Sequence, residues 1–192
     1  MSTVAAILAA GEASRFGSPK QLALYRGVAL VTHAVRAAAV PGVDATCVVL
    51  GAHAERVERV LDTLAEPVER MINAAWSEGI ASSLRAAVAW AASRDASSLV
   101  VLLCDQPLVT GSHVSELVRT WSRGASAVAS EYAGTWGAPA VFDAKLFPML
   151  RALRGDAGAG KALREWGDVA RVPFPGGAAD VDTPLDVVAL QP

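Results

Sequence analysis

Cysteine and histidine are scarce in this chain, which has two cysteines and three histidines among its 192 residues. Cys47 and Cys104 each lie within an apolar run, T-C-V-V-L and V-V-L-L-C-D, where cysteine usually behaves as a small buried hydrophobe. We therefore expect two reduced core thiols and no disulfide. His33, His53 and His113 have no cysteine or carboxylate at ligand spacing, which argues against a zinc site.

A basic excess and long apolar runs are missing as well. The 17 lysines and arginines are scattered and are outnumbered by 19 acids, for a formal net charge of −2. Because nucleic-acid binding needs a concentrated basic surface, we expect no nucleic-acid partner. No apolar segment approaches the ~20 residues of a membrane-spanning helix, and no basic leader precedes the first apolar run, so we expect no membrane association and a cytoplasmic location. The G-x-S-x-G motif of many hydrolases is also missing.

What the chain has in quantity is apolar side chains, at 53% of all residues against 19% charged. Together with the length of 192 residues, this composition predicts one well-buried α/β domain over 1–192. The expected strands of the first part are 4–10, 45–50, 68–72 and 99–104, and the expected helices are 28–39, 54–64, 80–92 and 112–121. This alternation predicts a three-layer fold with a mostly parallel, Rossmann-like sheet and helices on both faces.

The rest of the chain is less regular. Its expected strands are 126–130, 140–142 and 169–173, and its expected helices are 144–153 and 159–166. The glycine-rich A-G-T-W-G-A-P separates the first two of these strands. A last short helix should begin at Thr183-Pro184, with threonine as its cap and proline in its first turn.

The loop after the first expected strand carries the clearest chemical signal, in I-L-A-A-G-E-A-S-R-F-G-S-P-K over residues 7–20. Gly11 and Gly17 allow positive φ or close approach to a ligand, so that successive backbone N–H groups can point at an anion. Arg15 and Lys20 bring two mobile cations to the same loop. The pattern is typical of polyphosphate binding, although glycines alone would fit an ordinary strand-to-loop connection.

Acidic residues stand where a divalent cation could be held. Asp105 directly follows the most apolar expected strand, so its carboxylate should emerge at the carboxyl edge of the sheet, where ligands bind in open α/β folds. Asp180 and Asp182 lie two residues apart in A-D-V-D-T-P-L-D and can point to one side, and Mg²⁺ prefers such oxygen ligands. Turn formation or helix capping is the alternative role for these acids, and for Asp186 it is the one we favour.

A third segment, N-A-A-W-S-E-G-I-A-S-S-L-R-A-A over 73–87, places small residues at the start of an expected helix. Gly79, Ser82 and Ser83 could offer N–H and hydroxyl groups to a base or ribose. Plain helix capping explains them as well.

Taken together, these motifs resemble those of the molybdenum cofactor cytidylyltransferases within the MobA-like nucleotidyltransferases. The resemblance rests on L-A-A-G-x-x-S-R-x-G-x-x-K, N-A-A-W-S-E-G-I-A-S-S-L-R, L-L-C-D-Q-P and D-x-D-T-P-x-D, which occur in the family's order. It implies a single MobA-like domain that transfers CMP from CTP, or another nucleotide from its triphosphate, to molybdopterin and releases pyrophosphate. A molybdoenzyme or its chaperone is the implied protein partner.

The resemblance also implies roles for individual residues. Asp105 and Asp182 would bind Mg²⁺, Arg15 would hold the leaving pyrophosphate, and Lys20 would stabilise charge at the α-phosphate. The implied nucleotide-binding residues are Leu8, Ala9, Ala10, Gly11, Gly79, Ser82 and Ser83. The implied residues on the acceptor side are Gly137, Pro139, Gly155 and Asp156.

Two places depart from expected patterns. The family's G-H-P is Gly137-Ala138-Pro139 here, and the loss of the imidazole leaves a sugar phosphate, phospholactate or another small phosphate open as the acceptor. Residues 155–161, G-D-A-G-A-G-K, fit the spacing of a P-loop, but Ala162 stands where serine or threonine would contact magnesium, so we reject that interpretation.

Two other classes of function remain possible on this fold. An oxidoreductase would need a nicotinamide or flavin site, yet no G-x-G-x-x-G follows an expected strand. A non-catalytic nucleotide-binding or cofactor-binding protein would keep the loop over 7–20 but would not need both Asp105 and Asp182.

Overall fold

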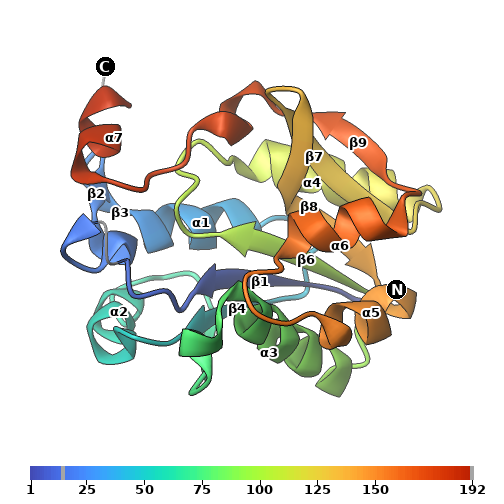
Figure 1. Cartoon of the computed structure of the whole chain (residues 1–192), viewed down its shortest axis with the longest axis horizontal. Helices are drawn as coiled ribbons and strands as arrows, with labels where there is room; N and C mark the ends of the chain where they lie inside the picture. The colour runs from blue at the N-terminus through green and yellow to red at the C-terminus, as the bar shows by residue number, and fades with distance from the viewer. Residues whose placement is uncertain (14–15, 191–192) are drawn as a thin grey trace.

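The computed structural model describes residues 1–13 and 16–190. Across these residues the main feature is a seven-stranded sheet in the order β5-β4-β1-β6-β8-β7-β9 (Figure 1). The strands are β1 (Thr3–Ala9), β4 (Ala45–Leu50), β5 (Glu69–Ile72), β6 (Ser98–Leu103), β7 (Ala127–Tyr132), β8 (Thr135–Asp143) and β9 (Ala170–Pro173).

Strand direction divides the sheet into two parts. The neighbours β5, β4, β1 and β6 are all parallel, so their carboxyl ends meet at one edge. Strand β8 runs antiparallel to both β6 and β7, while β9 is parallel to β7. The predicted mostly parallel sheet is therefore confirmed, with an antiparallel hairpin inserted beside its centre.

Helices cover both faces of the sheet, as the sequence predicts (Figure 1). Side chains of one parity on β1, such as Val4 and Leu8, pack with α3 (Ile80–Ser93), α5 (Phe147–Ala152) and α6 (Ala159–Trp166). The alternate side chains, such as Ala5 and Ile7, pack with α1 (Leu30–Ala38), α2 (Ala54–Leu61) and α4 (Gly111–Ser122). Burial on both faces explains why β1 and β6 are continuous apolar runs without alternation.

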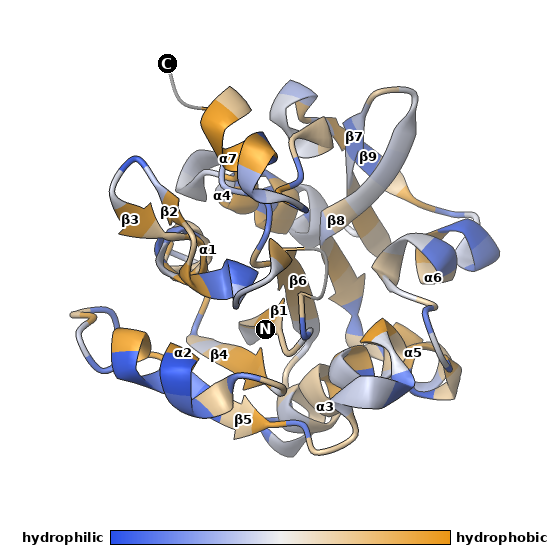
Figure 2. Cartoon of the chain, turned by 60° about the vertical axis from the view of Figure 1, so that its left-hand side comes forward, coloured by the Kyte–Doolittle hydropathy of each residue, from blue (hydrophilic) through white to orange (hydrophobic). Residues whose placement is uncertain are grey.

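The hydropathy of the elements follows this layering (Figure 2). The central strands are apolar, whereas α2 shows a polar outer surface. On α2, Val57 and Leu61 are buried and Glu55 and Arg59 are exposed, which is the amphipathic pattern of a helix lying on a core. No helix in the described part of the chain is both long and apolar enough to cross a bilayer.

Two hairpins were not expected. Residues 28–29 form β3 (Val28–Ala29), paired with β2 (Leu24–Tyr25), so the helix predicted from 28 begins only at Leu30. Arg26 and Gly27 connect these strands with φ of 50° and 74°, the left-handed geometry of a tight hairpin turn. The second hairpin turns at Ala133-Gly134, again with both φ values positive, so most of A-G-T-W-G-A-P belongs to β8.

The C-terminal part of the chain returns to the carboxyl edge of the sheet. Helix α7 (Pro184–Ala189) packs beside the β2-β3 hairpin, where Val181 and Val187 form a small apolar cluster with Tyr25 and Leu30 (Figure 1). The helix predicted over 144–153 is a short 3-10 turn, η4 (Ala144–Leu146), followed by α5. Cys47 and Cys104 are buried and unpaired, as predicted.

Candidate active site

Lys20 joins two carboxylates that are far apart in the sequence. Its Nζ donates to Asp105 Oδ2 at 2.6 Å and to Asp182 Oδ1 at 3.2 Å. Lys20 begins the 3-10 turn η2 (Lys20–Leu22) after β1, and Asp105 follows the adjacent strand β6 with only Cys104 between them. The predicted convergence of the two acids and the cationic loop at one sheet edge is therefore observed.

Backbone hydrogen bonds bring Asp182 to this position. The N–H of Val181 donates to the carbonyl of Asp105 at 2.9 Å, which ties the C-terminal segment to the end of β6. Asp186 Oδ2 accepts from the N–H groups of Asp182 (3.0 Å) and Thr183 (2.7 Å) and from the Thr183 hydroxyl (2.9 Å). Asp186 thus caps α7, as we expected, and it also fixes the backbone that presents Asp182.

The charge of Lys20 is stabilised by its acidic neighbours. Burial alone would lower the pKa of Lys20, but the nearby Asp105 carboxylate and the hydrogen bonds to both acids outweigh it, so its pKa is raised above the ordinary value. The side chains of Lys20 and Asp105 are only 17% and 19% exposed. A permanent ammonium ion at this edge can neutralise charge on a phosphate ligand.

The acids also have the chemistry for a magnesium ion. Oδ1 of Asp105 is buried and has no hydrogen-bond partner among the described residues, so one strong acceptor is left over at the site. In the described part of the chain no group of three or more His, Cys, Asp or Glu side chains is arranged to hold a metal. The two carboxylates of Asp105 and Asp182 nevertheless suit Mg²⁺, because this ion binds through one or two carboxylates and completes its shell with water and phosphate oxygens.

A cavity of about 340 Å³ opens at the same sheet edge. Its lining includes Lys20 and Asp105 together with the predicted nucleotide-binding residues Leu8, Ala9, Ala10, Gly11, Gly79 and Ser83. Arg15, the second predicted catalytic cation, lies outside the described residues.

Gln21 shapes this cavity, although sequence reasoning gave it no role. Its Nε2 donates to the carbonyls of Ala9 (2.9 Å) and Gly11 (2.7 Å), and the side chain is only 2% exposed. These bonds tie η2 to the end of β1. Lys20, the residue before Gln21, is thereby held beside the acids. Its position directly after Lys20 was the available signal.

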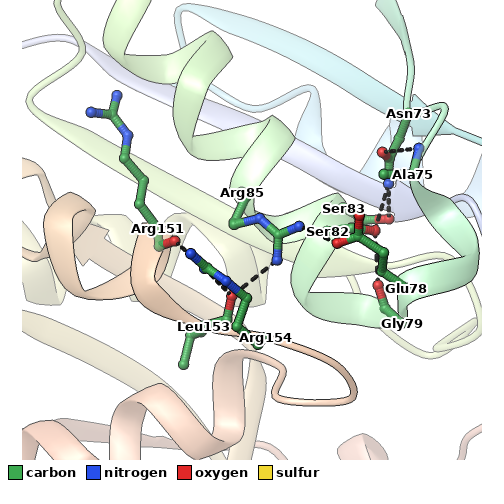
Figure 3. Close-up of polar contacts among 10 residues, drawn as sticks. All are labelled: Asn73, Ala75, Glu78, Gly79, Ser82, Ser83, Arg85, Arg151, Leu153 and Arg154. Atoms are coloured by element: carbon green, nitrogen blue, oxygen red, sulfur yellow. Dashed lines mark hydrogen bonds and ion pairs between the residues drawn. The ribbon is translucent and has the colours of Figure 1, made fainter.

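The start of α3 forms the opposite wall. Asn73 Nδ2 donates to the hydroxyls of Ser82 (2.8 Å) and Ser83 (3.1 Å), and the Ser82 hydroxyl donates to the carbonyl of Gly79 at 2.9 Å (Figure 3). Ser83 lines the cavity, whereas the Ser82 proton is used within this network and Ser82 lies outside the lining. The buried Asn73 was not singled out from the sequence, although it opens the motif over 73–87.

The segment after α5 docks onto α3. Arg85 donates to the carbonyl of Leu153 at 3.0 Å and pairs with Glu78 at 2.6 Å (Figure 3), and the Ala81 N–H donates to the carbonyl of Gly155 at 3.0 Å. These contacts place Asp156 in the lining of the first cavity, beside residues that the resemblance predicts to bind the nucleotide. The resemblance had implied a position for Asp156 on the acceptor side.

A second cavity of about 260 Å³ adjoins the first and shares Leu8, Ile80 and Leu103 with it. Gly137, which the resemblance assigns to the acceptor side, lines this second cavity. Pro139 is not among the lining residues, and its carbonyl accepts from the Ser130 hydroxyl at 2.6 Å. The two cavities could hold a donor and an acceptor side by side.

Two relatives are similar in sequence to the chain over most of its length. Nicotine blue oxidoreductase of Paenarthrobacter nicotinovorans is 35% identical over 167 residues, covering 83% of this chain and 80% of the relative. The purine catabolism protein PucB of Bacillus subtilis is 28% identical over 195 residues, covering 94% of this chain and 92% of PucB.

Solved structures agree with these sequence matches. The crystal structure of Rv0371c from Mycobacterium tuberculosis superposes with a TM-score of 0.81 at 28% identity, covering 99% of this chain and 98% of Rv0371c. A crystal structure of Rv0371c in complex with manganese superposes with a TM-score of 0.78 at 27% identity, over 99% of this chain and 98% of that one. Residues 5–170 match the MobA-like NTP transferase domain. The chain therefore belongs to the MobA-like NTP transferase family and is a nucleotidyltransferase by family.

Proposed function

We propose that the chain transfers CMP from CTP to the phosphate of molybdopterin in a Mg²⁺-dependent reaction that releases pyrophosphate. The observation that carries this proposal is the position of Lys20 between Asp105 and Asp182, in the wall of a cavity that Gly11 and Gly79 also line. One ammonium ion and two carboxylates at the carboxyl edge of a parallel sheet suit a magnesium triphosphate.

Positioning of the substrates and neutralisation of phosphate charge account for most of the rate acceleration in this kind of reaction. Asp105 and Asp182 would hold Mg²⁺, which supplies positive charge to the phosphate oxygens when it is bound. Lys20 donates to the α-phosphate as negative charge develops there, and Arg15 holds the departing pyrophosphate. No general base is needed, because a phosphate monoester is already ionised near neutral pH.

The divalent metal has support from two sides. Oδ1 of Asp105 lacks a partner among the described residues and is buried, which is costly unless a cation or water satisfies it. The related Rv0371c has been crystallised with manganese. Mn²⁺ and Mg²⁺ share a preference for carboxylate and phosphate oxygens, so we expect either ion to support turnover in this chain.

CTP as the donor and molybdopterin as the acceptor rest on the motif resemblance. The first cavity has small residues, Gly11, Gly79 and Ser83, where a base and ribose would lie. The second cavity has aromatic walls from Tyr132 and Trp136, which suit a ring system better than a simple sugar. A molybdoenzyme or its chaperone would receive the product.

The test is a pyrophosphate assay. The protein is incubated with Mg²⁺ and molybdopterin and with CTP, GTP, ATP or UTP in turn, and pyrophosphate and the dinucleotide product are measured. We expect product with CTP above the other triphosphates, none without molybdopterin, and loss of turnover on chelation of the metal. Failure of all four triphosphates to give pyrophosphate would contradict the proposal.

A second candidate function is redox catalysis, because the relative at 35% identity is named nicotine blue oxidoreductase. An oxidoreductase would bind a nicotinamide or flavin cofactor, and oxidation of NADH or NADPH in the presence of a quinone-like dye would reveal it. Nucleotide binding without any turnover in either assay would favour a non-catalytic binding protein.

A further inference from the structure

The wall of the second cavity carries a cation that the transfer reaction does not use. Arg164 on α6 lines this cavity together with Tyr132, Trp136 and Ala138. Helix α6 packs against the apolar core beside β8 and so faces the hairpin that bears the two aromatic residues (Figure 1). Because the cavity adjoins the first through Leu8, a cation here could contact the ring system of an acceptor whose phosphate lies near Lys20.

Gly160, one helical turn before Arg164, leaves room for the guanidinium group. A Cβ atom at Gly160 would lie 3.4 Å from Arg164 Nη1 and 3.8 Å from the carbonyl oxygen of Trp136. Long side chains on a helix extend back over the preceding turn, so the guanidinium group lies across Gly160 and toward Trp136. A larger residue at position 160 would compete for this space.

The charge of Arg164 is not matched by a carboxylate. Among the residues that the structure describes, no ion pair or hydrogen bond involves its side chain, whereas nearby cations are paired. Lys161 Nζ lies 3.7 Å from Glu165 Oε1, and Arg171 Nη1 lies 3.4 Å from Glu131 Oε1. A guanidinium group presents a planar fork of donors suited to a carboxylate, phosphate or similar oxyanion.

Aromatic surface adjoins this cation. The Arg171 guanidinium carbon lies 3.9 Å from the centre of the Trp136 ring, which fixes the indole from the side of β9. The Tyr132 hydroxyl oxygen lies 2.8 Å from where a Cβ atom of Gly137 would be, so the glycine allows the phenol to approach the hairpin backbone. Flat walls and a guanidinium fork together suit a ring that bears an anionic group.

We propose that Arg164 determines acceptor specificity by binding an anionic group attached to a flat heterocyclic ring in the second cavity. The inference rests on the proposed function, because it assigns the acceptor to that cavity, and it selects a pterin-type acceptor over a sugar phosphate. The role of Arg164 is recognition, so it should affect acceptor binding and leave the donor site unchanged.

A binding experiment tests the proposal without catalysis. Titration calorimetry is performed on the full chain with 6-carboxypterin, which has ring and anion, with pterin, which lacks the carboxylate, and with glucose 1-phosphate, which lacks the ring. The wild type should bind 6-carboxypterin at least tenfold more tightly than either other compound. Arg164→Gln should remove the preference over pterin, and the neighbouring Lys161→Gln should retain it. Circular dichroism confirms that both variants fold.

The result would overturn the proposal if Arg164→Gln bound 6-carboxypterin like the wild type, or if the wild type bound it no better than glucose 1-phosphate. Kinetics separates this inference from the proposed function. With molybdopterin, Arg164→Gln should raise the acceptor KM about tenfold while kcat and the CTP KM stay unchanged. Arginine-dependent binding of 6-carboxypterin without any nucleotidyl transfer would refute the proposed reaction but retain the binding site.

Discussion

The Lys20 ammonium nitrogen lies 2.6 Å from a carboxylate oxygen of Asp105, a residue 85 positions away in the sequence. The pair links the loop after β1 to the end of β6, and Asp182 joins it from the C-terminal segment. The side chains of Lys20 and Asp105 both line the cavity at this edge of the sheet. Their proximity therefore joins three distant segments of the chain beside the cavity at the sheet edge.

The first prediction follows from this pair. Lys20→Ala and Asp105→Ala should each lower kcat at least about 10²-fold, because each removes charge placed for the phosphate groups. Pyrophosphate release under saturating CTP, Mg²⁺ and molybdopterin measures the loss, and circular dichroism checks that the variants fold. Lys161→Ala, which removes an exposed lysine on α6, is the matched control and should keep wild-type turnover. Normal pyrophosphate release by either site variant would count against the mechanism.

A second prediction concerns Gly79 at the start of α3. Its φ is 103°, and a Cβ atom there would lie 2.5 Å from the carbonyl oxygen of Gly155 and 2.6 Å from Asp156 Oδ1. Gly79→Ala should therefore combine backbone strain with a clash and lower the free energy of unfolding by more than about 2 kcal/mol. It should also raise the KM for CTP, because Gly79 and Asp156 both line the cavity in which we propose that CTP binds.

Gly124 is a matched control for this variant. Its φ is 107°, almost the same, but no atom lies within 4 Å of its added Cβ. Gly124→Ala should lower the free energy of unfolding by only about 1 kcal/mol, because it adds backbone strain without a clash. Urea denaturation of both variants measures the difference, and equal losses would show that the contact with the 155–156 segment contributes nothing.

Much of the fold could be predicted because local pattern and tertiary burial agree. The strand over 45–50 and the helix over 159–166 have the predicted bounds, since a valine-rich run and an amphipathic segment each match their surroundings. The β2-β3 hairpin could not be read in this way, because each strand has only two residues. Strand β8 was missed over 135–139 because it contains glycine and proline, which usually interrupt strands.

The sequence likewise predicts some residues of the candidate site and misses others. Lys20, Asp105 and Asp182 could be predicted because they belong to motifs at ends of predicted strands, where the chain geometry brings side chains together. Gln21 and Asn73 were missed, because their partners are backbone carbonyls and hydroxyls that only the folded chain identifies. The position of Asp156 depends on the docking of the 155–156 segment onto Gly79, a long-range contact without a local signature.

A third prediction tests Gln21. Gln21→Met keeps the approximate volume of the side chain but removes the two hydrogen bonds to the carbonyls of Ala9 and Gly11. We expect a loss of about 1–3 kcal/mol in the free energy of unfolding, because buried carbonyls lose their donor. The KM for CTP should rise as the loop after β1 relaxes, while the KM for the acceptor should stay the same.

Comparison with Gln21→Ala separates hydrogen bonding from packing. The alanine variant also removes buried volume, so it should be less stable than the methionine variant. Urea denaturation and initial-rate kinetics give both quantities. If Gln21→Met matched the wild type in stability and in the KM for CTP, the amide contacts would have no structural role.

The last prediction concerns the pH dependence of stability at His113. The ring is 8% exposed and stacks on Phe174 with ring centres 4.2 Å apart. The Ser130 hydroxyl lies 2.7 Å from His113 Nε2 and donates its proton to the carbonyl of Pro139 at 2.6 Å, so Nε2 must carry the proton that His113 donates to Ser130. Burial lowers the pKa of His113 from 6.5 to about 4 in the folded chain.

The direction of the effect follows from this lowered pKa. Between pH 6.5 and 4 the unfolded chain binds a proton at His113 that the folded chain does not, so folding becomes less favourable as the pH falls. The free energy of unfolding should fall by about 2–3 kcal/mol between pH 6.5 and 4. His113→Gln, which cannot titrate, should be less stable than the wild type at pH 7.5 yet lose less stability between pH 6.5 and 4. Urea denaturation at these pH values measures the change, and parallel curves for the two proteins would contradict a buried, neutral imidazole at this position.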